Sequence, residues 1–450
     1  MNSGQPNLLF VFSDQHRWCD LGCQGNRDVH SPHLDRFAAD GLRFERALSN
    51  APLCVPARGC LLTGRYPLGH GAWSNDLPVN PQVDSVARAL GRAGYRTGYF
   101  GKWHLGGVPR DQPIVERRRL GFHDWKACNC SHDYLASYYY DADNQRHQID
   151  GYDAAAYTGF AEDFIRRAAE SDAPWAAWLS WGPPHDPYFE VPRHWLERYA
   201  GRRLPLRPNV PERIVERRPD RMWSRDTVER NLHGYYAHIS ALDHQFGRLL
   251  EALDESGQRK NTIVVYTSDH GDMCGSHGMM DKHYCLYDDI LRVPLLVRWP
   301  GLTKAGQTVD APVVHEIDLA ATFAEIATGG VPENMQGESL RGVLRGESEP
   351  RSHAVASYHG SQFGLFSSRS IRDAQWKYVW NLTDVDELYD LTNDPWELRN
   401  LAGEADHQDR LRALRAALAR ELEDLGDPLF NLFTREQLLG DAKPRGGFTK

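Results

Sequence analysis

The 450-residue chain contains no long apolar run and no surplus of positive charge. No window approaches the roughly 18 apolar residues that span a bilayer, so we expect no membrane partner. Residues 1–6 are polar, and no basic segment with an apolar stretch of signal-peptide length follows them, which predicts a cytoplasmic protein. The net charge of -9 argues against a nucleic-acid binder, whose surface would be basic.

Metal-binding cysteine pairs are also missing. The eight cysteines include no C-x-x-C pair, and Cys128 and Cys130 are too close for ordinary disulfide or metal geometry, so we expect reduced thiols. Lysine is scarce beside arginine, which draws attention to Lys102 and Lys282. With 25% charged and 41% hydrophobic residues, the composition is that of a folded globular protein.

Short apolar runs alternate with longer amphipathic segments. This pattern is typical of βαβ units, so we predict an α/β fold with a large, mostly parallel central sheet flanked by helices. Strands are expected at 8–12, 97–100, 175–180, 263–267 and 293–299. Helices are expected at about 85–93, with Asp84 as its N-cap, at about 154–169 and at about 227–253.

The pattern changes near residue 350. Alternating apolar residues at 376–380 and 387–391, followed by a helical pattern near 408–422, predict a small antiparallel sheet with a covering helix. We therefore expect a catalytic domain over 1–350 and a C-terminal α+β subdomain over 351–450.

Polar side chains follow four of the predicted strands. Asp14, Lys102 and His185 each come after one strand, and Asp269 and His270 follow another. Ligands of open α/β sheets bind at the carboxyl ends of parallel strands, so these side chains predict one site at that edge.

The segment 54–65 reads Cys-Val-Pro-Ala-Arg-Gly-Cys-Leu-Leu-Thr-Gly-Arg. A fixed cation such as Arg58 near Cys54 lowers the thiol pKa and favours an anionic partner. The segment resembles the signature C-x-P-x-R-x(4)-T-G-R of type I sulfatases, members of the alkaline phosphatase superfamily. In that family the cysteine is oxidised to formylglycine (3-oxoalanine), whose hydrate is the nucleophile.

The resemblance assigns further roles. Lys102 and His104, in Gly-Lys-Trp-His-Leu-Gly, resemble the second sulfatase signature, and His185 and Lys282 resemble groups that bind sulfate and assist the leaving oxygen. The implied catalytic residues are Cys54, Arg58, Lys102, His104, His185 and Lys282. Asn75, His283 and His359 are candidates for substrate contact.

A divalent metal is the expected cofactor. Hard cations prefer oxygen ligands, and the resemblance implies a site formed by Asp14, Gln15, Asp269 and His270 together with the side chain at position 54. Many relatives carry Asp where this chain has Gln15 and Asn where it has His270. An imidazole ligand suits manganese better than calcium. We expect Ca2+, with Mn2+ or Mg2+ as alternatives.

The expected activity is hydrolysis of a sulfate monoester, with a sulfated sugar favoured as substrate and an aryl or choline sulfate as alternatives. The competing class is a phosphonate monoester or phosphodiester hydrolase of the same superfamily, which Gln15 and His270 keep open. The aromatic-rich segment 111–152 could contact substrate or be a packed insertion. The expected partners are a small anionic ester and, during maturation, a formylglycine-generating enzyme; the oligomeric state stays open.

The motif predicts that Cys54 alone is converted to formylglycine. Cys60 lacks proline and arginine at the corresponding offsets. Protein made together with the maturing enzyme should be lighter at Cys54 by the difference between H₂S and one oxygen atom, as measured by peptide mass spectrometry. Cys60→Ala is the control and should leave this conversion unchanged; robust turnover by Cys54→Ala would contradict the assignment.

Overall fold

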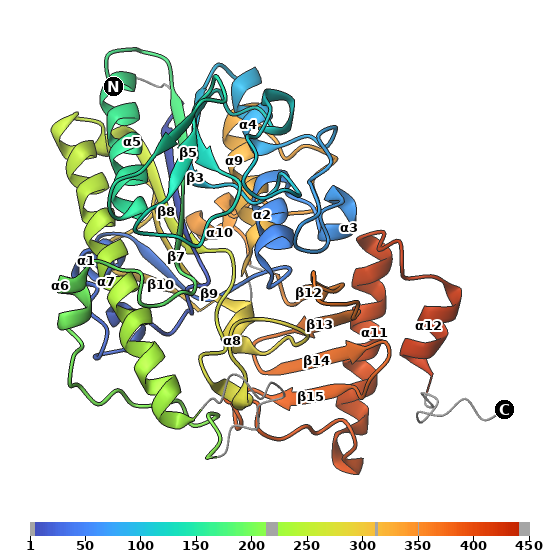
Figure 1. Cartoon of the computed structure of the whole chain (residues 1–450). Coiled ribbons are helices and arrows are strands. Elements are labelled where there is room, and N and C mark those ends of the chain that lie inside the picture. Colours follow the sequence, from blue (N-terminus) through green and yellow to red (C-terminus); the bar gives the residue numbers. More distant parts are fainter. Residues whose placement is uncertain (1–4, 213–223, 311–313, 350, 441–450) are drawn as a thin grey trace.

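The computed structural model describes residues 5–212, 224–310, 314–349 and 351–440. Within these ranges it confirms the α/β fold, with a large, mostly parallel sheet between helices and a smaller antiparallel sheet beside it (Figure 1). No described helix combines the length and the apolar composition that crossing a bilayer requires.

Parallel strands form the centre of the large sheet. In spatial order they are β8 (Thr262–Ser268), β1 (Asn7–Asp14), β7 (Trp175–Pro184), β3 (Arg96–Lys102) and β4 (Asp124–Cys128). The middle strands are largely apolar and buried, as parallel strands covered on both faces must be. Because they are parallel, their carboxyl ends meet at one edge, as the sequence predicted.

Shorter strands extend both sides of this centre. Beyond β8 lie β9 (Arg292–Arg298), β2 (Leu42–Leu48), β10 (Gln307–Val309) and β11 (Val314–His315), and beyond β4 lie β5 (Tyr138–Tyr140) and β6 (Arg146–Gln148). The hairpin of β5 and β6 belongs to the segment 111–152, so part of this segment packs as an extension of the sheet.

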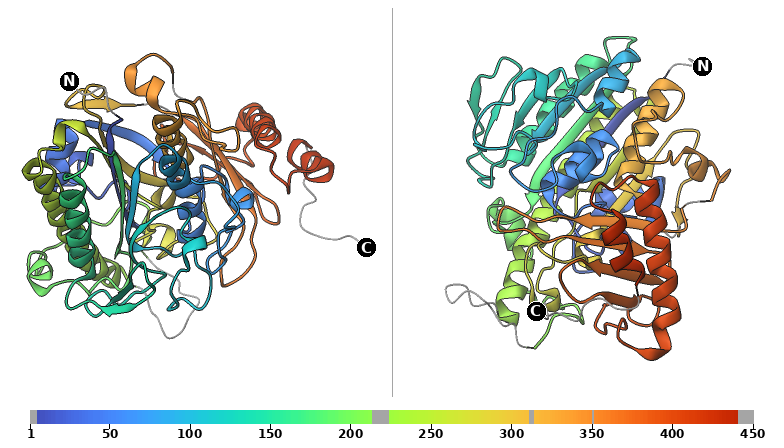
Figure 2. Two further views of the ribbon diagram at one scale, coloured as in Figure 1. Left: turned by 90° about the horizontal axis from the view of Figure 1, so that it is seen from above. Right: turned by 90° about the vertical axis from the view of Figure 1, so that its right-hand side faces the viewer.

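Two layers of helices cover the sheet (Figure 2). One contains α1 (Pro32–Asp40), α5 (Asp153–Ala168) and α7 (Arg225–Glu255); the other contains α2 (Cys54–Thr63), α4 (Val86–Arg92) and α9 (Glu316–Thr328). Successive side chains of a strand point to opposite faces. Leu9 and Val11 of β1 therefore pack in the first core, and Leu8, Phe10 and Phe12 pack in the second.

One predicted helix cap is wrong. Ser85, not Asp84, caps α4, since its hydroxyl accepts the backbone N–H of Arg88 at 3.2 Å. Asp84 instead forms an ion pair with Arg92 at 2.7 Å. The long helix α7 extends beyond its predicted ends, and the Ser224 side chain caps its start.

The smaller sheet begins shortly after residue 350. Its antiparallel strands are β12 (Ala354–Tyr358), β13 (Ser368–Arg372), β14 (Trp376–Asn381) and β15 (Glu387–Asp390), covered by α11 (Gln408–Asp424) and then α12 (Leu432–Leu439). Short helical segments elsewhere are α3 (Pro67–His70), α6 (Arg193–Glu197), α8 (Asp288–Leu291), α10 (Arg341–Arg345), and the 3₁₀ turns Gly22–Gln24, Glu116–Arg118, Arg259–Asn261, Ser276–Gly278 and Ala405–His407. The division of the chain at 350 stays a prediction.

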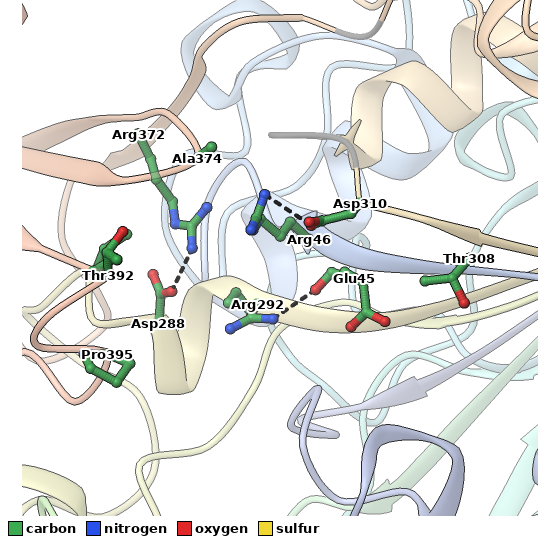
Figure 3. A pocket seen from close by; sticks show the side chains of 11 residues that line it. Glu45, Arg46, Asp288, Arg292, Thr308, Asp310, Arg372, Ala374, Thr392 and Pro395 are labelled. Carbon is green, nitrogen blue, oxygen red and sulfur yellow. Dashed lines mark hydrogen bonds and ion pairs between the residues drawn. The ribbon is translucent and has the colours of Figure 1, made fainter.

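A polar cavity of about 540 Å³ lies where the two sheets meet (Figure 3). Arg372 of the smaller sheet reaches Asp288 of α8 at 3.0 Å across this seam. Lys377 of β14 is fully buried, lies 3.2 Å from Asp288 and also pairs with Glu397. Burial opposes ionisation of Asp288, but Arg372 and Lys377 lower the pKa of its carboxyl. Buried charges therefore join the smaller sheet to the larger part of the molecule.

Lys377→Met should weaken the fold strongly. The substitution leaves Glu397 buried without its cation, and breaking a buried pair on one side costs about 3–5 kcal/mol. The free energy of unfolding in urea should fall by about this amount. Lys304→Met, at an exposed position, is the control and should change it by less than about 0.5 kcal/mol. An equal, small effect of both variants would show that the seam does not depend on Lys377.

Candidate active site

Cys54 is the first residue of α2, and every residue of this helix is buried. The Asn75 side-chain oxygen accepts the backbone N–H of Val55 at 3.1 Å and so holds the start of the helix. Burial opposes ionisation of Cys54, but Lys282, Lys102 and His270 outweigh it and lower the pKa of the thiol well below its usual range. The cysteine therefore lies in a buried, electropositive environment.

Arg58 lies one helical turn after Cys54 and is fully buried. Its Nη2 is 2.9 Å from Asp14 Oδ2, and its Nε is 3.0 Å from Asp269 Oδ2. Its Nη1 donates to the Lys102 carbonyl and to the Ser180 hydroxyl, both at 2.7 Å. One guanidinium thus connects the ends of β1 and β3 with the interior of β7 and the residue after β8.

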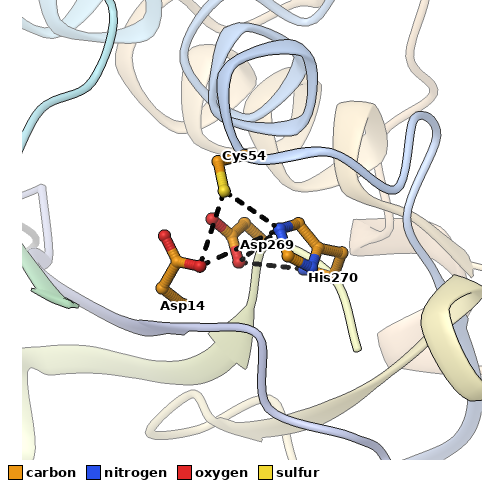
Figure 4. Close-up of side chains that lie close together, drawn as sticks. All are labelled: Asp14, Cys54, Asp269 and His270. Carbon is orange, nitrogen blue, oxygen red and sulfur yellow. Dashed lines mark hydrogen bonds and ion pairs between the residues drawn. The ribbon is translucent and has the colours of Figure 1, made fainter. Parts of the chain in front are cut away.

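Asp14, Cys54, Asp269 and His270 form a buried cluster (Figure 4). The Cys54 Sγ is 3.6 Å from Asp14 Oδ1 and 3.3 Å from His270 Nε2, and one ligand atom from each of the four residues lies within 4.8 Å of the others. Arg58 occupies the Oδ2 atom of both carboxylates, which leaves Oδ1 of each within 3.8 Å of His270 Nε2. Carboxylate and imidazole ligands of this kind suit a divalent cation.

Gln15 lies beside this cluster but makes other contacts. Its side-chain oxygen accepts a hydrogen bond from the Lys282 ammonium, and its side-chain nitrogen donates to Asp272 at 2.6 Å. Its backbone N–H donates to Asp269 Oδ1 at 3.0 Å. A role of Gln15 as a metal ligand stays a prediction, since in this structure its amide oxygen is bonded to Lys282.

Lys102 and His104 come from the end of β3. The Lys102 ammonium is 2.7 Å from Asp14 Oδ2. Gly101 allows the end of β3 to lie close to β7 just before Lys102. A Cβ at its position would lie 1.8 Å from the Ser180 carbonyl, and its φ of +112° favours glycine. His104 is 3% exposed; burial opposes its positive charge, but the neighbouring Cys130 raises the pKa of the imidazole.

His185 and Lys282 complete the set of charged groups. The ring of His185 stacks on His132 with centroids 4.5 Å apart, and its Nδ1 lies 3.0 Å from Asp186. Lys282 is 2% exposed and lies 2.9 Å from Asp281. Burial and Lys282 oppose protonation of His185, but Asp186 raises the pKa of the imidazole well above its usual range.

The structure thus brings the predicted catalytic and metal-binding residues to one edge of the sheet. The substrate-contact candidates are more scattered. Asn75 supports α2, and His283 lies 3.2 Å from Asp281 beside Lys282. His359 lines a separate cavity of about 190 Å³ between α3, β12 and α11.

Sequence reasoning did not assign roles to Asp186, Asp281 or Cys130. Asp186 and Asp281 could have been suspected from their positions, because Asp186 follows His185 and Asp281 precedes Lys282 directly. Cys130 lies 3.6 Å from His132, and His132 stacks on His185. Their proximity to the cluster depends on how separate loops meet, which the sequence does not show.

A buried thiol, fixed cations and a carboxylate–imidazole cluster meet at the carboxyl edge of the parallel sheet, an arrangement suited to binding an anionic group. Comparison with known proteins identifies the family. Residues 6–330 match the family model of the sulfatases, and residues 275–425 match the model described as N-sulphoglucosamine sulphohydrolase, C-terminal. The chain belongs to the sulfatase family and is a hydrolase of sulfate esters.

Individual relatives agree with this membership. An ulvan-active sulfatase of Formosa agariphila is 34% identical over 94% of this chain and 82% of its own length. A structure solved with its substrate D-glucosamine-2-N,6-O-disulfate has a TM-score of 0.83 and 25% identity, covering 94% of this chain and 99% of that one. The phosphonate monoester hydrolase of Agrobacterium radiobacter has a TM-score of 0.75 and 26% identity, covering 94% of this chain and 96% of its own.

Proposed function

We propose that this sulfatase hydrolyses a sulfate ester of a sugar, with formylglycine at position 54 as the source of the nucleophile. The contact that carries the proposal is that of Cys54 with the metal-type cluster, 3.3 Å from His270 and 3.6 Å from Asp14. The ulvan-active relative and the structure with a disulfated glucosamine support a sulfated sugar as substrate. A formylglycine-generating enzyme is the partner that this maturation requires.

Fixed positive charge is the main catalytic means of the pocket. A sulfate monoester carries one negative charge, and its transition state transfers charge to the bridging oxygen. Arg58, Lys102 and Lys282 supply cations in a buried site, where such charges act strongly and need little reorganisation. Burial opposes the charge of Lys102, but Asp14 outweighs it and raises the pKa of the ammonium, so it stays charged at neutral pH.

Two histidines can move protons. His185 lies near Asp281, the partner of Lys282, and Asp186 raises the pKa of its imidazole, which favours the protonated form that can donate to the departing oxygen. His104 can take the proton from the second hydroxyl of the aldehyde hydrate, which then expels sulfate and restores the carbonyl. A serine or an unmodified cysteine would retain a stable sulfated adduct, so the aldehyde makes turnover possible.

We propose that Asp14, Asp269, His270 and the position-54 side chain hold one divalent cation, with Gln15 as a further ligand. When bound, such an ion acidifies a hydroxyl group and stabilises negative charge on oxygen. Ca2+ is the first choice by resemblance to the family, and the side-chain oxygens of Asp14, Asp269 and Gln15 suit it. The His270 imidazole favours Mn2+ as an alternative, and Mg2+ is a further alternative for the oxygen ligands.

Calorimetry should show one site for CaCl₂ in the matured protein. Loss of an outer-shell partner of a metal typically costs about 10–100-fold in affinity, so Asp269→Asn, which replaces a directly coordinating carboxylate by a neutral amide, should cost at least about 10-fold. Gln15→Asp should raise the affinity for Ca2+ relative to Mn2+, because it adds a carboxylate oxygen. Asp20→Asn, which alters another buried carboxylate paired with an arginine, is the control. An unchanged Ca2+ affinity of Asp269→Asn would show that this cluster is not the metal site.

A phosphonate monoester hydrolase is the second candidate. Gln15 and His270 favour it, as does the similarity to the Agrobacterium radiobacter enzyme. A phosphonate monoester or phosphodiester replaces one peripheral oxygen of the sulfate group by an organic group, which needs open space. Here Lys102, His104 and Lys282 are each 3% exposed or less, which favours a compact group whose peripheral oxygens all receive donors.

The two candidates differ in substrate preference. The matured enzyme should show a kcat/KM at least about tenfold higher for 4-nitrophenyl sulfate than for 4-nitrophenyl phenylphosphonate, which has the same leaving group. Cys54→Ala should lose both activities, which excludes a contaminating hydrolase. If the phosphonate is the better substrate by about tenfold or more, the proposed sulfate specificity is wrong, whereas the nucleophile and the fold would stand.

A further inference from the structure

The loop between β12 and β13 reaches the active site from the smaller sheet. The Ser361 Oγ lies 3.0 Å from the Tyr284 hydroxyl, and the Phe363 ring lies edge-on to His283 with centroids 5.1 Å apart. His283 directly follows Lys282 in the chain. The smaller sheet thus contributes side chains to the region next to Lys282.

A continuous strip of side chains connects this loop to the catalytic groups. One ligand atom each of His185, Asp186 and Asp281 lies within 4.8 Å of the others. The two oxygens of Asp281 lie 2.9 Å from Lys282 and 3.2 Å from His283, and His283 in turn contacts Phe363. The strip runs outward, because His185 is 6% exposed whereas Phe363 is 62% exposed.

The backbone of this loop makes a tight turn that leaves its apolar side chains exposed. Gly360 has a φ of +120°, and a Cβ there would lie 2.7 Å from the Gly364 carbonyl, so only glycine fits. Ser361 and Gly364 pair as an isolated antiparallel bridge. Leu365 is 83% exposed beside Phe363. A single exposed apolar side chain needs no explanation, but two on a tightly turned loop beside a catalytic edge indicate a binding surface.

We propose that Phe363 forms a subsite that stacks on a second sugar ring, adjoining the ring that carries the sulfate ester. This inference rests on the proposed function. The ester-bearing ring lies against His185 and Lys282, and the next ring reaches Phe363, which lies beyond His283 along the strip. The C–H face of a sugar packs against an aromatic ring, and the carboxylates of Asp186 and Asp281 accept hydrogen bonds from sugar hydroxyls. Choline sulfate or a small aryl sulfate would not reach this surface.

The test compares matched substrates of the matured enzyme. The probes are a sulfated monosaccharide and the disaccharide with the same sulfated ring, chosen as the pair with the fastest sulfate release, together with 4-nitrophenyl sulfate. Phe363→Ala should lower kcat/KM for the disaccharide about three- to tenfold, mainly through KM, and leave the two smaller substrates within about twofold. Phe363→Trp should retain the disaccharide activity. Phe433→Ala removes another exposed phenylalanine, 68% exposed on α12, and is the control.

An equal loss of kcat/KM for all three substrates would show that the loop only positions Lys282. An unchanged kcat/KM for the disaccharide would show that Phe363 does not bind sugar. Either result overturns the subsite. Calorimetry of the same disaccharide with the Cys54→Ala protein, with and without Phe363→Ala, tests binding apart from turnover. If the wild-type enzyme releases no sulfate from any sugar, but a sulfated disaccharide of the screen still binds and loses affinity in Phe363→Ala, the proposed function fails and the subsite stands.

Discussion

The ion pairs of Arg58 with Asp14 and Asp269 are the interaction on which the rest of the site depends. All three side chains are completely buried, and the guanidinium also holds the Lys102 carbonyl and the Ser180 hydroxyl. A buried carboxylate is costly unless it is paired. The arginine therefore allows two acids to lie side by side in the core, and it fixes where the central strands end relative to one another.

The same arrangement shifts the pKa values of the two carboxyl groups in opposite directions. Burial and the neighbouring thiol oppose ionisation of Asp14, but Lys102 and Arg58 outweigh them and lower the pKa of its carboxyl. Asp269 is also paired with Arg58, but burial and the charge of Asp14 raise the pKa of its carboxyl. A divalent cation would favour the ionised form of both acids, because it adds positive charge where the two Oδ1 atoms approach His270.

Much of the fold followed from local patterns. The apolar strands and the polar residues at their ends are contiguous in sequence, so Asp14, Lys102 and Asp269 could be placed at one edge before any contact was known. The cap of α4 could not, because Asp84 and Ser85 are both good caps. In the structure Ser85 accepts the helix N–H, and Asp84 pairs with Arg92. The approach of Phe363 to His283 joins distant segments through a turn, and no local pattern encodes it.

The burial of α2 also fixes an order of events. Cys54 is 1% exposed, and every residue of its helix is buried, so another enzyme cannot reach the thiol in the folded protein. If position 54 carries an aldehyde, Cys54 has to be oxidised while the chain is still extended, before α2 packs against β1 and α9. Maturation and folding would then compete in time, and a chain that folds first would be trapped as a stable, inactive thiol form.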